Sequence, residues 1–273
     1  MKIPKPVKIY RKLLYRKGYG VHSPFIFNLI TKVIEEKSPY YFYEDIENFR
    51  NDLVAKKNKI SIFTKREAKN SKYGALISRL VNFFKCNSVI QLGGSTGIVS
   101  LYAAFPLKSS CRCYILEERR GMMDAAKSFA EAAGLQNYTV MEGNYSEKIE
   151  KIKTENQFFD LIFLNHFGDA DKTANSLQLI EPLICEKTVL VIDNISGNQK
   201  MLDLWERIKR SPKTGVTIDL YALGIVLFND KLNKSHYKCY FDYGKKQNLY
   251  KKRRRGFHFF SRRKKSAENQ PQN

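Results

Sequence analysis

The sequence predicts an α/β fold in which helices cover both faces of a mostly parallel sheet. The prediction rests on a change of rhythm near residue 88, after which short apolar runs alternate with segments of helical periodicity. Strands that alternate with helices form βαβ units, and such units build parallel sheets buried on both sides. Five apolar runs predict the parallel strands, at residues 89–92, 113–116, 138–141, 161–164 and 189–192.

Helical segments lie between these runs, at residues 97–105, 122–133, 146–152 and 173–183. A further helix is expected over 201–209, and three short apolar runs follow it at 216–221, 224–228 and 237–241. The gaps between these last runs are too short for a helical crossover, so we expect an antiparallel meander. This order of elements predicts a Rossmann-like, doubly wound, seven-stranded sheet that is mostly parallel and ends in a C-terminal antiparallel hairpin.

Additional helices are expected before the sheet. Ser23 followed by Pro24 predicts a helix start, because serine caps the free N–H groups of a first turn and proline fits the first helical position. Apolar residues at helical spacing continue from there and recur over residues 76–84. Residues 37–70 are assigned to helix and loop. We therefore expect an N-terminal helical and basic accessory segment over 1–70 and the main domain over 71–244.

The positive charge is concentrated at the two ends of the chain. The net charge of the 273 residues is +21; residues 1–20 hold seven Lys or Arg and no acid, and residues 245–273 hold eleven against Glu268 alone. Residues 245–273 end in a polar stretch and are expected to form a basic disordered tail. Their basic runs, with Phe257, Phe259 and Phe260, suit RNA or an anionic membrane surface, and a solvated basic terminus is the simpler interpretation.

The sequence predicts a cytoplasmic protein. No window approaches the roughly eighteen apolar residues of a membrane span, and no apolar signal region follows the basic N-terminus. The cysteines are scattered and form no C-x-x-C pair, so we expect buried free thiols at Cys86, Cys111, Cys113, Cys185 and Cys239. Oligomeric state is left open.

A glycine-rich turn follows the first predicted strand. It consists of Gly93, Gly94, Ser95, Thr96 and Gly97. Glycines permit a tight turn and a close approach of the backbone to a ligand, and such a turn between a strand and a helix is also found in ordinary βα loops.

An acid at the end of the next predicted strand narrows the class of ligand that this turn could bind. Glu117 follows Gly93 by 24 residues, and a carboxylate at that position accepts hydrogen bonds from ribose hydroxyls. The alternative is a surface ion pair with Arg119 or Arg120. Turn and acid together predict a nucleoside-containing ligand; the turn lacks the G-x-G-x-x-G spacing, which disfavours NAD.

Residues 89–241 resemble the class I S-adenosylmethionine-dependent methyltransferases related to catechol O-methyltransferase, and most of all a bacterial branch of that group. Motifs that carry the resemblance are Phe159-Asp160-Leu161-Ile162-Phe163, Val191-Ile192-Asp193-Asn194, Ala132-Ala133-Gly134-Leu135 and His22-Ser23-Pro24-Phe25. The resemblance implies an enzyme that uses S-adenosylmethionine to methylate an oxygen or nitrogen of an unidentified acceptor, most simply a small molecule.

The resemblance also implies residue roles. Residues 93–97 would hold the methionine part of the cofactor and Glu117 its ribose. Asn144, Tyr145 and Phe167 would surround the adenine, and Asn165 is assigned to the same cofactor site.

The metal chemistry of the catechol enzymes is expected to be weakened. Those enzymes use an Asp after strand four, followed closely by a Lys base, and an Asp-Asn pair after strand five. This chain keeps Asp193 and Asn194 but has Asn165 and Gly168 at the first two positions, and Gln91 where many relatives have an acid. One anion among neutral donors binds Mg²⁺ weakly, so no tightly bound metal is predicted.

Three residues are candidates for catalysis: His166, Asp193 and Asn194. An imidazole titrates near neutrality and could act as a base, although a structural histidine satisfied by a neighbour is equally compatible with the sequence. Asp169 is expected to cap the following helix. Two other functions remain open, an RNA-directed methyltransferase or RNA-binding protein that uses the basic ends, and a non-catalytic module that retains the fold.

Overall fold

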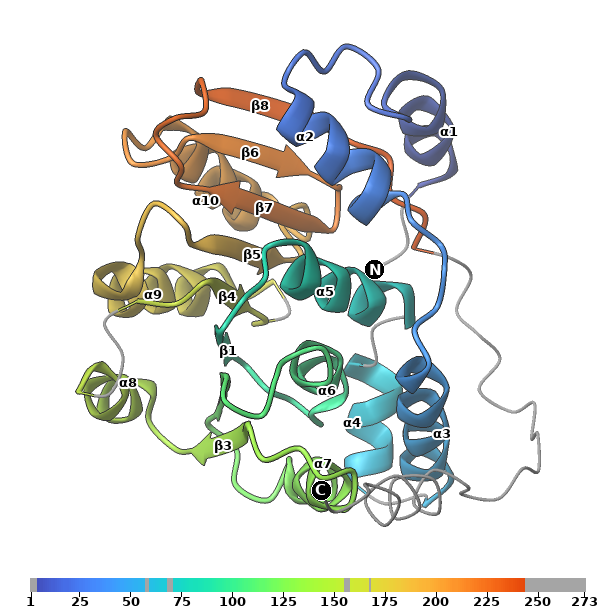
Figure 1. The fold of residues 1–273 in the computed structure, drawn as a ribbon, viewed down its shortest axis with the longest axis vertical. Helices are drawn as coiled ribbons and strands as arrows, with labels where there is room; N and C mark the ends of the chain where they lie inside the picture. Colours follow the sequence, from blue (N-terminus) through green and yellow to red (C-terminus); the bar gives the residue numbers. More distant parts are fainter. Residues whose placement is uncertain (1–3, 57–58, 68–70, 155–157, 167, 244–273) are drawn as a thin grey trace, which may run out of the picture.

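The computed structural model describes residues 4–56, 59–67, 71–154, 158–166 and 168–243. Its centre is a sheet in the order β3-β2-β1-β4-β5-β7-β6-β8 (Figure 1). The strands are β1 (Ser88–Leu92), β2 (Arg112–Glu117), β3 (Tyr138–Glu142), β4 (Leu161–Leu164), β5 (Val189–Asp193), β6 (Val216–Asp219), β7 (Leu223–Leu227) and β8 (Ser235–Lys238).

The predicted α/β class is confirmed, and so are the five parallel strands followed by an antiparallel hairpin. β1, β2, β3, β4 and β5 are parallel, and β7 is antiparallel to both β5 and β6. The sheet has eight strands where seven were expected, and the meander prediction was wrong in one respect: β8 pairs parallel with β6 and not with β7. β7 already has a neighbour on each edge, so the last strand cannot pair with it and adds to the free edge of β6.

Helices cover both faces of the sheet, as predicted. They are α1 (Lys5–Leu14), α2 (Pro24–Leu29), the π-helix η1 (Ile30–Ile34), α3 (Phe42–Ala55), α4 (Lys59–Glu67), α5 (Ser71–Phe83), α6 (Ile98–Ala104), α7 (Asp124–Ala132), α8 (Tyr145–Lys153), α9 (Ala170–Ile180), the 3-10 helix η2 (Glu181–Leu183) and α10 (Gln199–Arg210). One core packs α2, η1, α5 and α6 against one face, and a second packs α8, α9 and α10 against the other.

Alternation along the strands explains how one sheet serves two cores. In β1, Val89 belongs to the core under α5, whereas Ile90 and Leu92 belong to the core under α8 and α9. Successive strand residues point to opposite faces, so a run that is apolar throughout is buried on both sides. A third cluster joins α3 to α6 and α7, with the rings of Phe49 and Phe129 stacked 4.5 Å apart.

Several local predictions are confirmed. The Ser23 hydroxyl accepts a hydrogen bond from the N–H of Ile26 at 3.4 Å, and Asp169 caps α9 by accepting one from the N–H of Lys172 at 3.0 Å. All five cysteines are free; four are buried and Cys185 is half-buried. Among the residues that the structure describes, no helix is both long enough and apolar enough to cross a membrane.

Candidate active site

The turn between β1 and α6 lies at the point where the strand order reverses, beside the end of β4. The N–H groups of Gly93 and Gly94 both donate to the carbonyl of Leu116 in β2, at 2.9 and 3.1 Å. Gly93 and Gly97 have φ angles of +88° and +79°, and a Cβ on Gly93 would overlap the carbonyl oxygen of Asn165. The glycines are therefore required by backbone conformation and by the close approach of the neighbouring strand end.

Glu117 ends β2 against this turn, and the residue is only 3% exposed. One oxygen accepts the N–H of Ser95 at 2.6 Å. Three more donors come from Arg119: its backbone N–H at 3.0 Å, and Nε and Nη2 of its guanidinium at 2.8 and 3.3 Å. A carboxylate offers about four acceptor positions, so these donors fill them. The Arg119 pairing considered from sequence is present in this structure.

Arg119 also contacts the N-terminal part of the chain. Its guanidinium lies over the ring of Phe63 in α4, 5.0 Å from the centroid, an arrangement in which the ring attracts the cation. The end of β2 is thus linked to α4 by one arginine.

Two buried amides bracket the carbonyl of Gly93. Nε2 of Gln91 and Nδ2 of Asn165 donate to it at 3.0 and 3.1 Å. The other amide atom of each, Oε1 of Gln91 and Oδ1 of Asn165, is buried without a hydrogen-bond partner among the described residues. Buried polar atoms are almost always paired, so this pair of acceptors fits a ligand that brings N–H donors, such as the ammonium group of S-adenosylmethionine.

The predicted adenine residues lie at the same edge. Tyr145 begins α8, the helix that follows β3, and burial with the charges of Glu117 and Glu118 raises the pKa of its phenol above the ordinary range. Asn144 accepts a hydrogen bond from the N–H of Ser146 at 2.8 Å and so caps α8. Phe167 lies outside the described residues.

His166 follows Asn165 and is buried. Its Nε2 is hydrogen-bonded to the hydroxyl of Ser176 at 2.8 Å, and its ring centroid lies 5.8 Å from that of Tyr145. Burial, with a smaller contribution from Lys172, lowers the pKa of His166 to about 4. The imidazole is therefore neutral at pH 7 and a weak base, with one nitrogen engaged by a structural partner.

Asp193 ends β5 and is buried. Its Oδ1 accepts a hydrogen bond from the hydroxyl of Tyr73 in α5 at 2.9 Å. Burial and the Asp193 carboxylate raise the pKa of Tyr73 well above its usual value, so the phenol stays protonated and the hydrogen bond is charge-assisted.

The neighbouring Asn194 fills the space beside Gly168. Asn194 has a φ of +58° and Gly168 one of +89°, and a Cβ at position 168 would overlap the Asn194 amide nitrogen. A side chain at position 168 would therefore require the Asn194 amide to move. Among the described residues no group of three or more His, Cys, Asp or Glu side chains could hold a metal ion. Asp193 is the one carboxylate among Asn165, Asp193 and Asn194, and one of its oxygens accepts from Tyr73, so this donor set is poorly suited to Mg²⁺.

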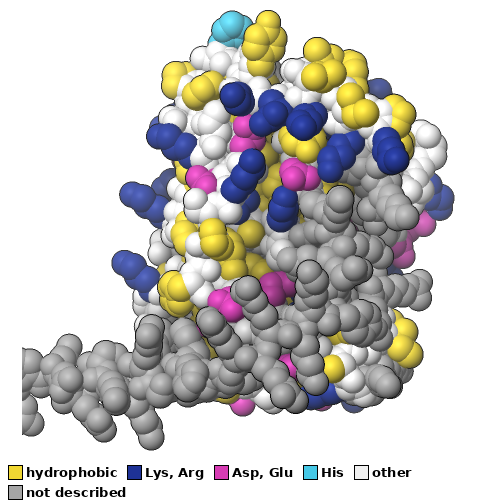
Figure 2. Space-filling view, turned by 90° about the vertical axis from the view of Figure 1, so that its right-hand side faces the viewer, with side chains coloured by type: hydrophobic (Ala, Val, Ile, Leu, Met, Phe, Trp, Pro, Cys, Tyr) yellow, Lys and Arg dark blue, Asp and Glu magenta, His cyan; other side chains and the backbone are white. Residues whose placement is uncertain are grey.

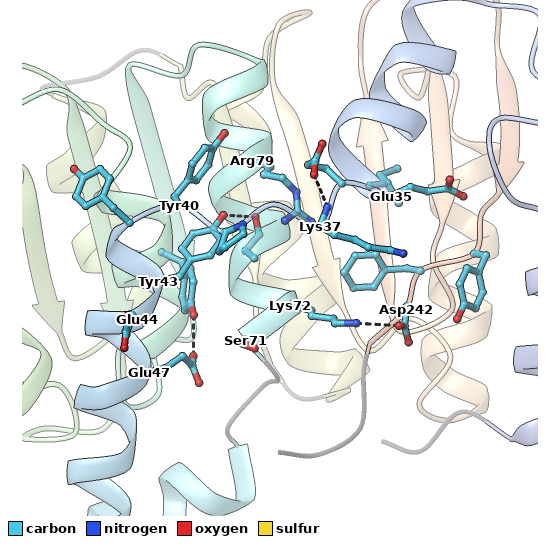
Figure 3. Close-up of a pocket in the computed structure, with 18 of the residues that line it drawn as sticks. Glu35, Lys37, Tyr40, Tyr43, Glu44, Glu47, Ser71, Lys72, Arg79 and Asp242 are labelled. Atoms are coloured by element: carbon cyan, nitrogen blue, oxygen red, sulfur yellow. Dashed lines mark hydrogen bonds and ion pairs between the residues drawn. The ribbon is translucent and has the colours of Figure 1, made fainter. Parts of the chain in front are cut away.

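A cavity of about 890 Å³ lies on the outer side of α5 (Figure 3). Ser71, Lys72, Ala75 and Arg79 line it from α5, and Tyr73 on the opposite side of that helix reaches Asp193. The remaining walls come from the end of α1, the segment from η1 into α3, one residue of α6, and the segment after β8. Helix α5 therefore links the cavity to the end of β5, although Asp193 itself does not line the cavity.

Both charged and aromatic side chains line this cavity. Tyr43 and Tyr102 are held by hydrogen bonds, to the carbonyl of Ala75 at 3.2 Å and to Glu47 at 2.8 Å. Arg79 is buried and donates its Nε to the carbonyl of Val33 at 2.7 Å. The volume is typical of a small-molecule site, whereas the lining is more strongly charged than usual, with ten Lys, Arg, Asp or Glu among its twenty residues.

Sequence reasoning missed two parts of this arrangement. Tyr73 is part of a helix whose apolar periodicity marks it only as a core position, and Arg119 was considered only as a surface ion-pair partner. The signal available in the sequence for the Arg119 contact was the short separation between Glu117 and two arginines.

Comparisons with known proteins agree with this geometry. A family model described as O-methyltransferase matches residues 44–234. No match was found among curated protein sequences. Among solved structures, an O-methyltransferase from Bacillus cereus in complex with SAH is similar, with a TM-score of 0.53 at 18% identity over 73% of this chain and 96% of that one.

Two further structures show the same fold. The O-methyltransferase TomG from Streptomyces achromogenes, in complex with SAM, has a TM-score of 0.55 at 14% identity and covers 75% of this chain and 94% of its own. An SAH-bound methyltransferase from Podospora anserina has a TM-score of 0.58 at 12% identity, covering 77% and 97%. Since the family model spans more than half of the sequence, the chain belongs to the O-methyltransferase family of S-adenosylmethionine-dependent enzymes.

Proposed function

We propose that this chain methylates an oxygen of a small-molecule acceptor, with the cofactor held where β1, β2 and β4 end. The observation that carries the proposal is the hydrogen bond between Ser95 and Glu117, which joins the glycine turn to a buried acid at the end of the next strand. The family narrows the acceptor atom to an oxygen, where the sequence left oxygen or nitrogen open.

Each cofactor group would find a matching partner. Residues 93–97 would hold the methionine part, with the unpaired oxygens of Gln91 and Asn165 accepting from its ammonium group. Glu117 would accept from the ribose hydroxyls once Arg119 yields its positions on the carboxylate. Tyr145, beside Glu117, would flank the adenine together with Asn144 and Phe167.

The bound cofactor supplies a methyl group on a positively charged sulfur. That methyl group would pass from the sulfur to an acceptor hydroxyl, whose proton would have to be taken up by a residue of the chain. Asp193 is the proposed proton acceptor, since it is a buried carboxylate at the end of β5, while His166 is a weaker candidate because its Nε2 is already bonded to Ser176. Alignment in a dry site then supplies most of the rate enhancement.

The proposed reaction proceeds without a tightly bound metal. Support comes from Tyr73, which occupies one oxygen of Asp193, and from Asn194, whose amide closes position 168. Asn194 would then orient the loop after β5, and it would not serve as a metal ligand.

The cavity on α5 is the proposed acceptor site. Rim residues Lys37 and Glu44 are exposed and line it. Turnover of S-adenosylmethionine with the small-molecule fraction of a cell extract should fall in Lys37→Ala and Glu44→Ala, while the dissociation constant for SAH stays unchanged. Equal turnover in both variants and wild type would place the acceptor elsewhere.

RNA as acceptor or partner remains a prediction that rests on the basic ends. Most of that charge belongs to residues 245–273, which lie outside the described residues. Deletion of 245–273 should abolish salt-dependent RNA binding if this function exists.

A non-catalytic module that retains the fold is the other alternative, and any SAH formation dependent on the chain argues against it.

Calorimetry with SAH tests the cofactor site. Loss of a hydrogen-bonded charge typically weakens binding by roughly tenfold to a hundredfold, and we expect this of Glu117→Gln. Glu118→Gln is the matched control, because Glu118 is exposed and pairs with Lys172 at 2.6 Å. Wild-type protein that binds neither SAH nor S-adenosylmethionine would refute the proposal.

A further inference from the structure

Helix α1 presents its apolar side to solvent. Ile9 and Leu13, four residues apart and hence on one face, are 59% and 77% exposed. Tyr10 and Leu14 are exposed beside them, and α1 has no buried residue. A surface helix of a globular protein normally turns such a stripe inward.

Charged residues hold α1 in this orientation. Both oxygens of the Asp219 carboxylate accept from Nη2 of Arg11 at 3.0 Å, and Nη1 of Arg11 donates to the Asp219 carbonyl at 2.9 Å. Lys8 donates to Asp242 at 3.2 Å. The polar face of the helix is therefore bonded to the domain through charge-assisted contacts, and its outward apolar face follows from that attachment.

Cations surround the exposed apolar residues. Residues 1–34 contain eight Lys or Arg and no Asp or Glu. Lys5 lies one turn before Ile9, and Lys12 lies three residues after it; both are exposed. In Figure 2, hydrophobic side chains gather in the upper part of the face, where α1 lies, with Lys and Arg side chains below them.

We propose that α1 docks on an anionic lipid surface. Apolar side chains flanked by lysines match a bilayer interface, which supplies acyl chains and negative headgroups side by side. A second copy of the chain would bring two strongly basic segments together, and residues 245–273 carry the same sign of charge. Charge complementarity therefore favours lipid over either of these occupants. This docking is a property separate from methyl transfer.

Docking would also orient the candidate acceptor site. Lys12 and Arg16 line the α5 cavity as well as belonging to the basic N-terminal segment. A bilayer that contacts Ile9 and Leu13 would thus lie close to one wall of the cavity.

Co-sedimentation of the full chain with vesicles tests the proposal. Wild type should bind phosphatidylserine–phosphatidylcholine vesicles and not pure phosphatidylcholine. The double variant Ile9→Ser/Leu13→Ser keeps all charges, yet it should bind roughly tenfold or more weakly, because two large apolar side chains no longer enter the interface. Ile62→Ser is the matched control: Ile62 is 65% exposed on α4, and its loss should leave binding unchanged.

Other outcomes separate the alternative occupants. Unchanged binding by the double variant would overturn the proposal, because cations or the basic tail alone would then carry the attachment. A wild-type dimer in lipid-free sedimentation that becomes monomeric in the double variant would identify a second copy as the occupant and also overturn it. Deletion of 245–273 should leave the difference between wild type and double variant in place.

Discussion

The hydroxyl of Tyr73 lies 2.9 Å from Oδ1 of Asp193, so a phenol from α5 occupies one oxygen of the carboxylate that ends β5. Both groups are buried, and the charge of Asp193 contributes to the raised pKa of Tyr73. The contact fixes α5, the wall of the cavity, to the edge of the sheet where the reaction is proposed to occur.

Tyr73→Phe should destabilise the protein and slow methyl transfer. Hydrogen bonds to a buried charged group contribute about 2 kcal/mol, and the free energy of unfolding should fall by about that amount in urea denaturation. Tyr19→Phe is the control, since Tyr19 is exposed. A stability equal to wild type would mean that the Asp193 carboxylate does not depend on the phenol.

Replacement of Gly168 should be costly in a way that depends on Asn194. A side chain at 168 adopts an unfavourable φ and overlaps the Asn194 amide, which together cost about 2–4 kcal/mol. Gly20→Ala isolates the backbone cost, because Gly20 has a φ of +74° but open space around it. Gly168→Ala should therefore lower the melting temperature more than Gly20→Ala.

A double-mutant cycle completes this test. In an Asn194→Ala background, Gly168→Ala should cost little more than Gly20→Ala, because the overlapping amide is gone. Additive effects of the two substitutions would show that Asn194 does not exclude side chains at position 168. Gly168→Lys should gain no stimulation by Mg²⁺, since the remaining donors do not form a metal site.

The sequence predicts the strands and the edge at which the site forms, because both follow from local pattern. Apolar runs define β1 to β5. Because these strands are parallel, residues 93–97, Glu117 and Asn165 come to one edge of the sheet whatever path the connecting segments take. The pairing of β8 could not be predicted in this way. It depends on the spatial order of β5, β7 and β6, which leaves one edge of β6 without a neighbour.

Contacts between segments that are far apart in the sequence could not be predicted from local patterns either. Tyr73 and Asp193 are 120 residues apart, and nothing in the helical periodicity of α5 distinguishes a tyrosine that reaches a carboxylate from one that packs in the core. The α5 cavity is assembled from several segments, including α1 and the segment after β8. Arg119 could be assigned to Glu117 only as one of two neighbouring arginines.

Arg119→Ala should strengthen cofactor binding. The guanidinium supplies two of the four donors that fill the Glu117 carboxylate, and the ribose hydroxyls must compete with them. Removing it should lower the dissociation constant for SAH by roughly threefold to tenfold. Arg120→Ala removes the same charge from an exposed neighbour and should have little effect. Weaker binding by Arg119→Ala would mean that the guanidinium contacts the cofactor itself.

His166 should make stability depend on pH between about 4 and 6.5. Its pKa is lowered from 6.5 to about 4 in the folded protein, so in this range the unfolded chain binds more protons than the native one. The contribution of the neutral imidazole to the free energy of unfolding is fully present above pH 6.5. It decreases as the pH drops towards 4, by at most about 3 kcal/mol. His166→Gln, which can still hydrogen-bond to Ser176, should flatten the profile of unfolding free energy against pH over this window. The wild-type-minus-variant difference isolates the histidine from the titrating carboxylates, and a difference that stays constant from pH 7 to pH 4.5 would show that His166 titrates normally in the folded protein.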